Sequence, residues 1–202
     1  MPFHALPLPA ADLAFDPHFL SPTLATALLE DLTDAVPWEQ RRIRLFGREL
    51  PQPRLTAWYG DPGAAYTYSG LRWEPRPWRQ QLDTLRRRVE AATGHRFNSV
   101  LLNLYRDGHD SMGWHADDEP ELGPAPVIAS LSLGATRRFR LRPRPGTAGE
   151  AFGLDLPSGS LLLMRPPTQA HWQHALPKTS RAVGPRLNLT FRWVSGRAND
   201  KP

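Results

Sequence analysis

A short motif near the middle of the chain combines residue types that bind metal ions. His115 and Asp117 lie two residues apart in GWHADDE, residues 113–119. In an extended segment their side chains project to the same side and can bind one ion. A third ligand is available in AHWQHALP, where His171 and His174 are both candidates. Two imidazoles and one carboxylate, with the other coordination positions open, are the ligand set of non-haem Fe(II) oxygenases, so the motif predicts an iron centre with room for a chelating co-substrate and O2.

The segment RLNLTFRW, residues 186–193, has a polar face that suits such a co-substrate. Successive side chains of a strand point to opposite faces. One face therefore carries Leu187, Leu189, Phe191 and Trp193, and the other carries Arg186, Asn188, Thr190 and Arg192. The polar face either meets water or lines a cavity that holds an anion, because a guanidinium binds a carboxylate through two parallel hydrogen bonds. Asn103 and Tyr105 in NLY are also two apart, either at a solvent-facing strand edge or in the same cavity.

Two helices are expected in the first half of the chain, where they would pack on the elements that carry these residues. SPTLATALLEDLTDAV, residues 21–36, begins with a serine that can cap a helix and a proline at the first helical position. RIRLFGREL, residues 42–50, predicts a hairpin with Phe46-Gly47 at its tip, and residues 51–77 are expected to be mainly loop. A second helix is predicted from an apolar spacing that ends at a glycine, namely Trp78, Leu82, Leu85, Val89, Ala92 and then Gly94.

Short alternating runs, separated by glycine and proline, follow from Phe97 onward. They are FNSVLLNLY, VIASLSL, RFRLR, GSLLLM and RLNLTFRW. The two long connections, 106–126 and 165–185, lack a helical period, so crossover helices and a parallel sheet are not expected. The prediction is an α+β, mainly β fold with an antiparallel jelly-roll or barrel core. We expect one domain over residues 1–202, with helices, hairpin and a lid in about 1–96 and the catalytic core in about 97–195.

The composition limits the classes of protein to which the chain can belong. It contains no cysteine, which excludes disulfide bonds and thiolate metal sites. The N-terminus lacks a basic start followed by an apolar run, and no segment is long enough to span a bilayer. A cytoplasmic protein without a membrane partner is therefore expected, and nothing in the sequence requires more than a monomer.

Basic residues give the chain a net charge of +5, which favours a polyanionic partner. Arginines cluster in RRIRLFGR, residues 41–48, and in TRRFRLRPR, residues 136–144. Alternation in the second cluster puts Arg138, Arg140 and Arg142 on one face. That face is either a solvated strand surface or a surface that contacts phosphates.

Five motifs in a fixed order resemble the signature of a known family. They are NLY (103–105), GWHADDE (113–119), IASLSLGA (128–135), HWQH (171–174) and PRLNLTFR (185–192). Together they resemble the AlkB family of Fe(II)- and 2-oxoglutarate-dependent dioxygenases, which remove alkyl groups from nucleic-acid bases. The resemblance extends from about Phe46 to Trp193 and implies a double-stranded β-helix core. It also implies that His174, with His171 as its neighbour, is the distal iron ligand.

The resemblance implies roles for residues of the catalytic core. His115, Asp117 and His174 would bind iron. Arg186 would pair with the far carboxylate of 2-oxoglutarate. The other residues implied in this pocket are Tyr105 and Asn188 beside Arg186, Asn103 and Arg192 near the end that chelates iron, and Thr190.

Residues of the lid and of the metal motif would face the substrate, a base flipped out of its stack. Tyr66, Tyr68 and Ser69 in YTYSG resemble the base-recognition lid of the family. Asp118 and Glu119 follow the metal ligand and would favour a cationic alkylated base through charge attraction. The plain alternative for the two acids is surface acidity in a loop.

Further residues would contact nucleic acid outside the pocket. Phe46 resembles the aromatic finger of relatives that act on double-stranded DNA, and its plain alternative is a core phenylalanine. Arg54 resembles a family arginine near the vacated stack, and its plain alternative is a surface arginine. Arg138, Arg140 and Arg142 would contact phosphates, which predicts salt-dependent affinity.

The function implied by the resemblance is oxidative repair of 1-methyladenine and 3-methylcytosine in DNA. 2-Oxoglutarate and O2 would be converted to succinate and CO2, and the alkyl group would leave as formaldehyde. The same chemistry on RNA or on another substrate is an alternative. A non-catalytic nucleic-acid-binding jelly roll is a second alternative, but it predicts a broken triad or a missing arginine, and here every position is filled.

Overall fold

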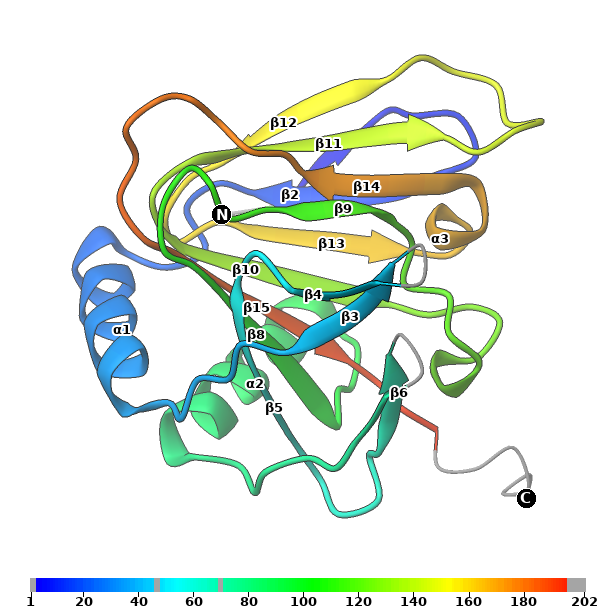
Figure 1. The fold of residues 1–202 in the computed structure, drawn as a ribbon. Coiled ribbons are helices and arrows are strands. Elements are labelled where there is room, and N and C mark those ends of the chain that lie inside the picture. Colours follow the sequence, from blue (N-terminus) through cyan, green and yellow to red (C-terminus); the bar gives the residue numbers. More distant parts are fainter. Residues whose placement is uncertain (1–2, 46–47, 69–70, 196–202) are drawn as a thin grey trace.

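Two antiparallel sheets form the centre of the computed structural model, which describes residues 3–45, 48–68 and 71–195 (Figure 1). The larger sheet has seven strands in the order β1, β2, β13, β10, β15, β8 and β5. In that order they span His4–Leu6, Asp12–Asp16, Leu161–Arg165, Ile128–Gly134, Arg186–Arg192, Ser99–Tyr105 and Leu55–Gly60. The smaller sheet has the order β12, β11, β14 and β9, which span Phe152–Leu156, Arg137–Pro143, Trp172–Leu176 and Met112–His115.

All pairings between the described strands of these two sheets are antiparallel, and the sheets pack face to face. Side chains of the larger sheet, such as Leu101 and Met164, meet Phe139 and Leu141 of the smaller sheet in one buried cluster. The predicted double-stranded β-helix is therefore confirmed. The strand order places β8 and β15 of the larger sheet beside each other, and β9 and β14 of the smaller sheet beside each other.

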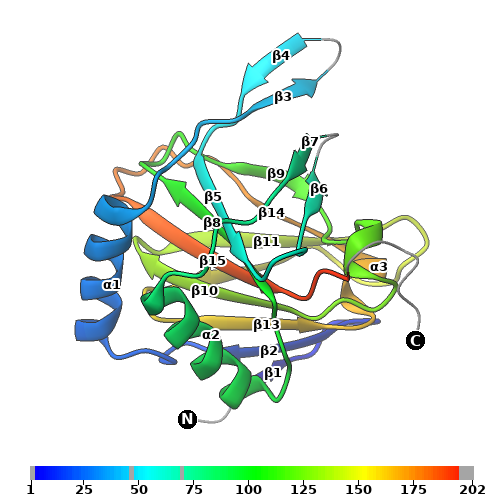
Figure 2. The same cartoon turned by 90° about the horizontal axis from the view of Figure 1, so that it is seen from below.

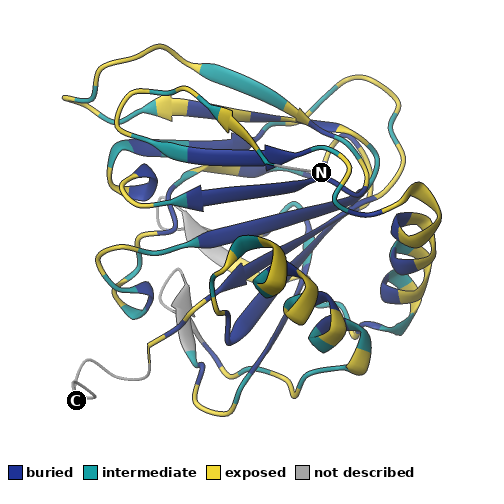
Figure 3. Cartoon of the chain, turned by 180° about the vertical axis from the view of Figure 1, so that it is seen from behind, coloured by how far each residue is buried: buried dark blue, intermediate teal, exposed yellow. Residues whose placement is uncertain are grey.

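Two helices cover the outer face of the larger sheet, α1 over Pro22–Ala35 and α2 over Gln80–Thr93 (Figures 1 and 2). Each helix buries three apolar side chains that share one face, as the 3.6-residue period requires. They are Ala25, Leu28 and Leu32 on α1, and Leu82, Leu85 and Val89 on α2. Figure 3 shows the opposite sides of both helices exposed.

The ends of the helices follow local chemistry. Ser21 caps α1 by accepting a hydrogen bond from a backbone N–H of the first turn, as predicted. The apolar spacing placed the start of α2 at Trp78, but the helix begins at Gln80. Trp78 lies before it and donates its Nε1 to Asp61 Oδ1 at 2.6 Å. Ala92 is exposed and does not belong to the buried face. Gly94 ends α2 with φ of 72°, a left-handed conformation that glycine adopts without steric cost.

Residues 51–77 contain more strand than predicted, which corrects the expectation of a mainly loop region. β5 pairs with β8 from Leu55↔Leu104 to Gly60↔Ser99, and its side chains beyond Leu55 are buried. LTAWYG does not alternate between apolar and polar residues, because both of its faces are covered, so the period-two signal is absent. The N-terminal strands β1 and β2, and strands β9, β12 and β14, were not recognised as strands from the sequence either.

Two hairpins project from the same side of the molecule, away from α2 (Figure 2). One pairs β3 (Arg42–Leu45) with β4 (Arg48–Pro51), which confirms the predicted hairpin, although its tip at Phe46-Gly47 lies outside the described residues. The other pairs β6 (Tyr66–Tyr68) with β7 (Leu71–Trp73).

The two predicted long connections contain strands β9 and β14, and within the described residues their helical structure is limited to short turns. Residues 120–122 form the 3-10 turn Pro120–Leu122, and α3 is Thr168–His171. No helix in the described part of the chain is long and apolar enough to cross a membrane.

Strand β15 separates the two environments of the fold. Leu187, Leu189 and Phe191 have no exposed surface and pack in the cluster beneath α1 and α2. The alternating polar side chains of β15 are also buried, but on the face turned toward the smaller sheet. The solvated interpretation of that polar face is therefore wrong. Trp193 lies beyond the end of β15 and is exposed.

Candidate active site

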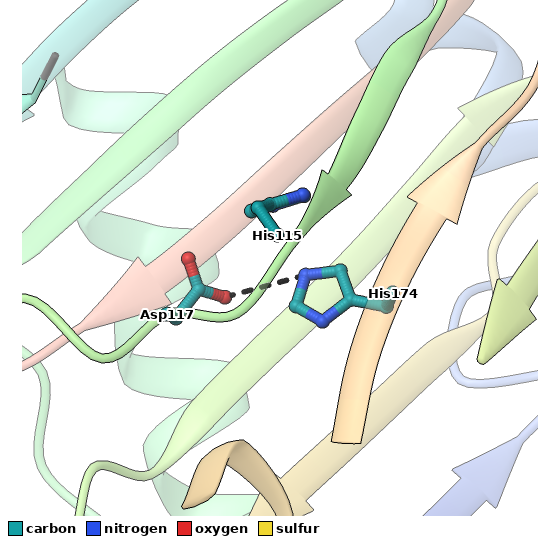
Figure 4. A group of neighbouring side chains, drawn as sticks. All are labelled: His115, Asp117 and His174. Atoms are coloured by element: carbon teal, nitrogen blue, oxygen red, sulfur yellow. Dashed lines mark ion pairs between the residues drawn. The ribbon is translucent and has the colours of Figure 1, made fainter. Parts of the chain in front are cut away.

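Three side chains from the smaller sheet meet between the two sheets (Figure 4). His115 is the last residue of β9, Asp117 follows it, and His174 lies in the middle of β14. The pairing His174↔His115 places both imidazoles on the same face, with ring centroids 4.2 Å apart. One ligand atom from each of the three residues lies within 4.8 Å of the others. This geometry and its N, N, O donor set fit one Fe(II) ion.

The electrostatics of the three residues prepare them for a cation. Burial lowers the pKa of both imidazoles, that of His174 to about 3, so the rings are neutral at pH 7 and their lone pairs are free to bind metal. Burial is the largest single effect on the pKa of Asp117 and would raise it, but the charge and hydrogen bond of Arg192 together with the two neighbouring imidazoles outweigh burial and keep that pKa below its ordinary value. The site therefore presents one fixed negative charge.

Neighbouring groups fix the orientation of the ligands. His115 Nδ1 lies 2.9 Å from the carbonyl oxygen of Gly113, which leaves its Nε2 for the metal. The backbone N–H of Asp117 donates to Gln169 Oε1 at 3.0 Å. His171, the alternative third ligand, lies on α3, and its Nδ1 is 3.3 Å from Thr147 Oγ1. The structure therefore brings His174, and not His171, into the triad.

A cavity extends from the triad between the sheets and contains the polar residues predicted for 2-oxoglutarate. Its lining includes the three ligands and apolar side chains such as Leu101, Phe139 and Met164. The structure also brings together at this cavity all six predicted co-substrate residues, namely Asn103, Tyr105, Arg186, Asn188, Thr190 and Arg192. β8 and β15 supply them in register, since Asn103↔Asn188 and Tyr105↔Arg186 are directly paired.

Arg186 forms the cationic end of this cavity. It is buried, its Nη2 donates to Ser132 Oγ at 2.9 Å, and its guanidinium lies 5.3 Å from the ring centre of Tyr105. Burial lowers its pKa to about 10, so it stays protonated at pH 7. Its Nε has no hydrogen-bond partner among the described residues. A buried unpaired donor is costly, and a carboxylate would satisfy it, so this end of the cavity fits a dicarboxylate.

Asn188 and Thr190 are tied to each other and to β10. Asn188 Nδ2 donates to Ser130 Oγ at 2.8 Å and to the carbonyl oxygen of Leu131 at 3.1 Å, while Thr190 Oγ1 donates to Asn188 Oδ1 at 2.9 Å. Ser130 and Ser132 were not assigned roles from the sequence. Their spacing of two residues in IASLSLGA, alternating with leucine, was the available signal.

Arg137 lies near Arg186, outside the lining of the cavity. It is buried and donates to three backbone carbonyls, from Nη1 to Asp107 at 3.0 Å and from Nη2 to Asp110 at 3.0 Å and Pro177 at 2.7 Å. These bonds join the loop after β8 to the loop after β14. The contacts of Arg137 were also missed, because a single arginine at the start of a basic strand has no distinguishing pattern.

Arg54 lies inside the protein, so the surface alternative for this residue is wrong. Its exposed fraction is 4%, and its Nε donates to Asn103 Oδ1 at 2.8 Å. Its Nη1 lies 3.5 Å from the carbonyl oxygen of Ser111. In this position Arg54 orients a residue that lines the cavity.

The other predicted substrate residues are only partly described. Asp118 is exposed and forms an ion pair with Arg144, and Glu119 is half-buried before the 3-10 turn. Tyr66 and Tyr68 are placed on β6 through their backbones. Phe46 and Ser69 lie outside the described residues.

Arg138, Arg140 and Arg142 are exposed on the face of the smaller sheet that points away from the triad. Arg138 forms an ion pair with Asp155 at 3.3 Å. Arg142 donates from Nε and Nη2 to Gln173 Oε1 at 3.0 and 2.9 Å. The predicted alternation of this strand is thus present, and the three arginines lie outside the cavity.

Comparison with known proteins places this architecture in a family. The model of the 2OG-Fe(II) oxygenase superfamily matches residues 12–192. The alpha-ketoglutarate-dependent dioxygenase alkB homolog 3 of Homo sapiens is 48% identical over 186 residues, which cover 88% of this chain and 64% of that protein. The DNA oxidative demethylase ALKBH2 of Mus musculus is 48% identical over 159 residues, covering 76% of this chain and 66% of that protein. The chain thus spans less than two thirds of the length of these relatives.

A solved structure of OsALKBH1 has the same fold. It superposes with a TM-score of 0.66 and covers 95% of this chain and 100% of its own, at 16% identity.

Proposed function

Because the chain belongs to the 2OG-Fe(II) oxygenase superfamily, with AlkB homologues as relatives, we propose that it dealkylates N-alkylated bases in nucleic acid. The proposed substrates are 1-methyladenine and 3-methylcytosine in DNA. The observation that carries this proposal is the joint presence, in one buried cavity, of a His-Asp-His triad and an arginine with an unpaired donor. A cavity that only bound nucleic acid would need neither group.

Separate groups of residues would bind the metal, bind the co-substrate and exclude water. His115, Asp117 and His174 would hold Fe(II), and Arg186 would hold the far carboxylate of 2-oxoglutarate. When bound, Fe(II) and 2-oxoglutarate would supply the activation of O2: 2-oxoglutarate is converted to succinate and CO2, and the second oxygen atom hydroxylates the alkyl carbon, after which formaldehyde leaves. Apolar side chains around the triad, including Leu101 and Phe139, keep bulk water from the reacting carbon.

Charge and the lid support a nucleic-acid substrate. The net charge of +5 favours a polyanion, and the β6–β7 hairpin carries two tyrosines that can stack on a base. Both N-methylated bases carry positive charge, and Asp118 and Glu119 lie next to a metal ligand, where their charge would attract such a base. One relative carries the name DNA oxidative demethylase, which supports DNA as the polymer.

The intact mass of an oligonucleotide with one 1-methyladenine tests the proposal. The oligonucleotide is incubated in air with the protein, Fe(II), ascorbate and 2-oxoglutarate, beside reactions that omit 2-oxoglutarate or use His174→Ala. We expect the methyl mass to disappear only in the complete reaction. A parallel reaction uses an RNA oligonucleotide of the same sequence. If the methyl group is lost only from that RNA, the substrate is RNA and not DNA. Succinate formation without any loss of mass would keep the oxygenase and reject these bases.

A further inference from the structure

We infer that the outer face of the smaller sheet is a binding track for single-stranded nucleic acid that flanks the damaged base. This inference rests on the proposed function and deepens it, because it assigns a partner to a surface outside the cavity. The track consists of Trp114, Arg142, Arg140 and Arg138 in that order, followed by a groove that contains Lys178 and Arg181. It starts beside the metal ligands, since Trp114 precedes His115 in the chain.

The register of the sheet aligns these side chains on one face. Arg142 lies opposite Gln173 and Arg140 opposite Ala175, while the intervening Leu141 lies opposite His174 and faces the triad. Arg138 and Arg140 lie opposite Asp155 and Gly153 of β12. The same strand therefore turns apolar side chains toward the iron site and arginines away from it.

The charge of this face is strongly one-sided. Asp155 is the single acidic residue in the four strands β9, β11, β12 and β14, and it pairs with Arg138 at 3.3 Å between two exposed side chains. Such an exposed ion pair is weak and can exchange for a phosphate. Arg140, Lys178 and Arg181 form no ion pair with an acidic side chain in the part of the chain that the structure describes. A row of cations with one weakly held acidic partner fits a polyanion better than it fits water alone.

The spacing of the arginines matches a nucleic-acid backbone. Alternate residues of a strand are roughly 7 Å apart. One strand of B-form DNA carries a phosphate about every 3.4 Å along its axis, so successive arginines match every second phosphate of a stacked strand. The guanidinium of Arg138 lies over Gly153 of β12, in space that a side chain there would occupy, since a Cβ at Gly153 would lie only 2.5 Å from its Nε.

Trp114 supplies a stacking surface at the start of the row. Its exposed fraction is 38%, and the guanidinium of Arg142 lies 4.4 Å from its ring centre. Arg142 is itself fixed by two hydrogen bonds to Gln173. Aromatic side chains combined with a basic groove are the usual means of binding single strands without regard to sequence. A duplex would hide its bases from Trp114, which is why the single strand is the partner that fits.

The first test is the salt dependence of binding to fluorescent dT12, measured by anisotropy. Each phosphate contact contributes a slope of about −0.7 in log affinity against log salt for single strands. R138S/R140S should therefore reduce the magnitude of the slope by about 1.4, and R138K/R140K should restore it. The matched control is R87S/R96S, which removes the same charge from exposed positions on and just after α2 and should leave the slope unchanged.

Trp114→Ala tests the stacking part of the track. It should weaken dT12 binding about tenfold without changing the slope, since a stacked base contributes little through counterions. The affinity ratio between dT12 and dT3 should also fall in R138S/R140S, because dT3 is too short to reach along the row. Equal slopes for R138S/R140S and R87S/R96S, or a loss of slope with duplex only, would overturn the inference.

The outcome is independent of the proposed function, because dT12 carries no alkyl group. Wild-type dealkylation of a 1-methyladenine oligonucleotide is measured in parallel by mass. Its absence would reject the proposed function while the anisotropy still decides the track. Dealkylation with unchanged slopes in R138S/R140S would reject the track alone.

Discussion

Arg54 and Asn103 are joined inside the protein by a hydrogen bond of 2.8 Å between Arg54 Nε and Asn103 Oδ1. Both side chains are buried, and Asn103 lines the cavity while Arg54 is absent from its lining. The bond uses the carbonyl oxygen of the Asn103 amide and leaves its NH2 group for another partner. Arg54 is therefore a positioning residue for the co-substrate end of the site, and its effect should depend on Asn103.

Arg54→Met should weaken binding of 2-oxoglutarate about tenfold, because Asn103 loses the partner that orients it. Calorimetric titration of 2-oxoglutarate into the Mn(II)-loaded protein measures this change. In Asn103→Ala the further change Arg54→Met should have little effect, since the two residues act as one unit. Additive losses in the double variant would show that Arg54 acts independently of Asn103.

Arg186→Gln should raise the KM for 2-oxoglutarate by about 30-fold or more, because a buried carboxylate would lose its charged partner. Ser132→Ala removes only one hydrogen bond from Arg186 and should raise the KM a few-fold. Initial rates of succinate formation at varied 2-oxoglutarate provide the values. A similar KM for wild type and Arg186→Gln would place the far carboxylate elsewhere.

His174→Ala should abolish tight metal binding, while His171→Ala should retain it. The first residue belongs to the triad, and the second lies on α3 beside Thr147. Mn(II) binding followed by electron paramagnetic resonance compares the two variants directly. Retained binding in His174→Ala together with loss in His171→Ala would exchange their assignments.

The metal-free protein should lose stability as the pH falls below about 6.5. Burial holds the pKa of His174 near 3 in the folded state, whereas an unfolded histidine titrates near 6.5, so between these values the unfolded state binds the extra proton. At pH 5 the cost is about 2 kcal/mol from this residue. Urea unfolding at pH 7 and pH 5 measures the change, which should be smaller in His174→Leu. Above pH 6.5 the protonation of His174 should no longer change the free energy of unfolding, in wild type or in His174→Leu.

The two faces of β15 should respond differently to substitution. Leu189→Ala opens a cavity in the cluster under the helices and should lower the free energy of unfolding by about 2–5 kcal/mol. Thr190→Val removes one hydrogen bond to Asn188 and should cost roughly 1 kcal/mol, while its main effect falls on the KM for 2-oxoglutarate. Thermal unfolding and initial rates together separate the two effects. A larger stability loss in Thr190→Val would contradict the division of faces.

The parts of the site that were predictable from sequence share a local pattern. His115 and Asp117, and the polar residues of β15, repeat every two residues, and this period survives in the fold because each strand separates two environments. β5 could not be found in the same way, since both of its faces are buried and LTAWYG therefore does not alternate. The period gives no information about which strand lies beside which.

Contacts between segments that are distant in the sequence could not be predicted from local patterns. Arg54 and Asn103 are 49 residues apart, and Arg137 reaches Pro177 across 40 residues. These bonds depend on strand order and register, which a single sequence does not specify. For the same reason the buried position of Arg54 was not predicted, because an isolated arginine is usually at the surface.

The hydrogen bonds that Arg137 donates to three backbone carbonyls bear on the order in which molecules bind to the cavity. Arg137 joins the loops after β8 and β14 near Arg186, and His115 at the triad remains partly exposed, so we expect molecules to enter and leave from the triad side. A base seated over the metal would then lie between the solvent and the molecule bound against Arg186. We therefore expect an ordered turnover, with the small dicarboxylate bound first and its shortened product released last, so that succinate should compete with 2-oxoglutarate and not with the polymer.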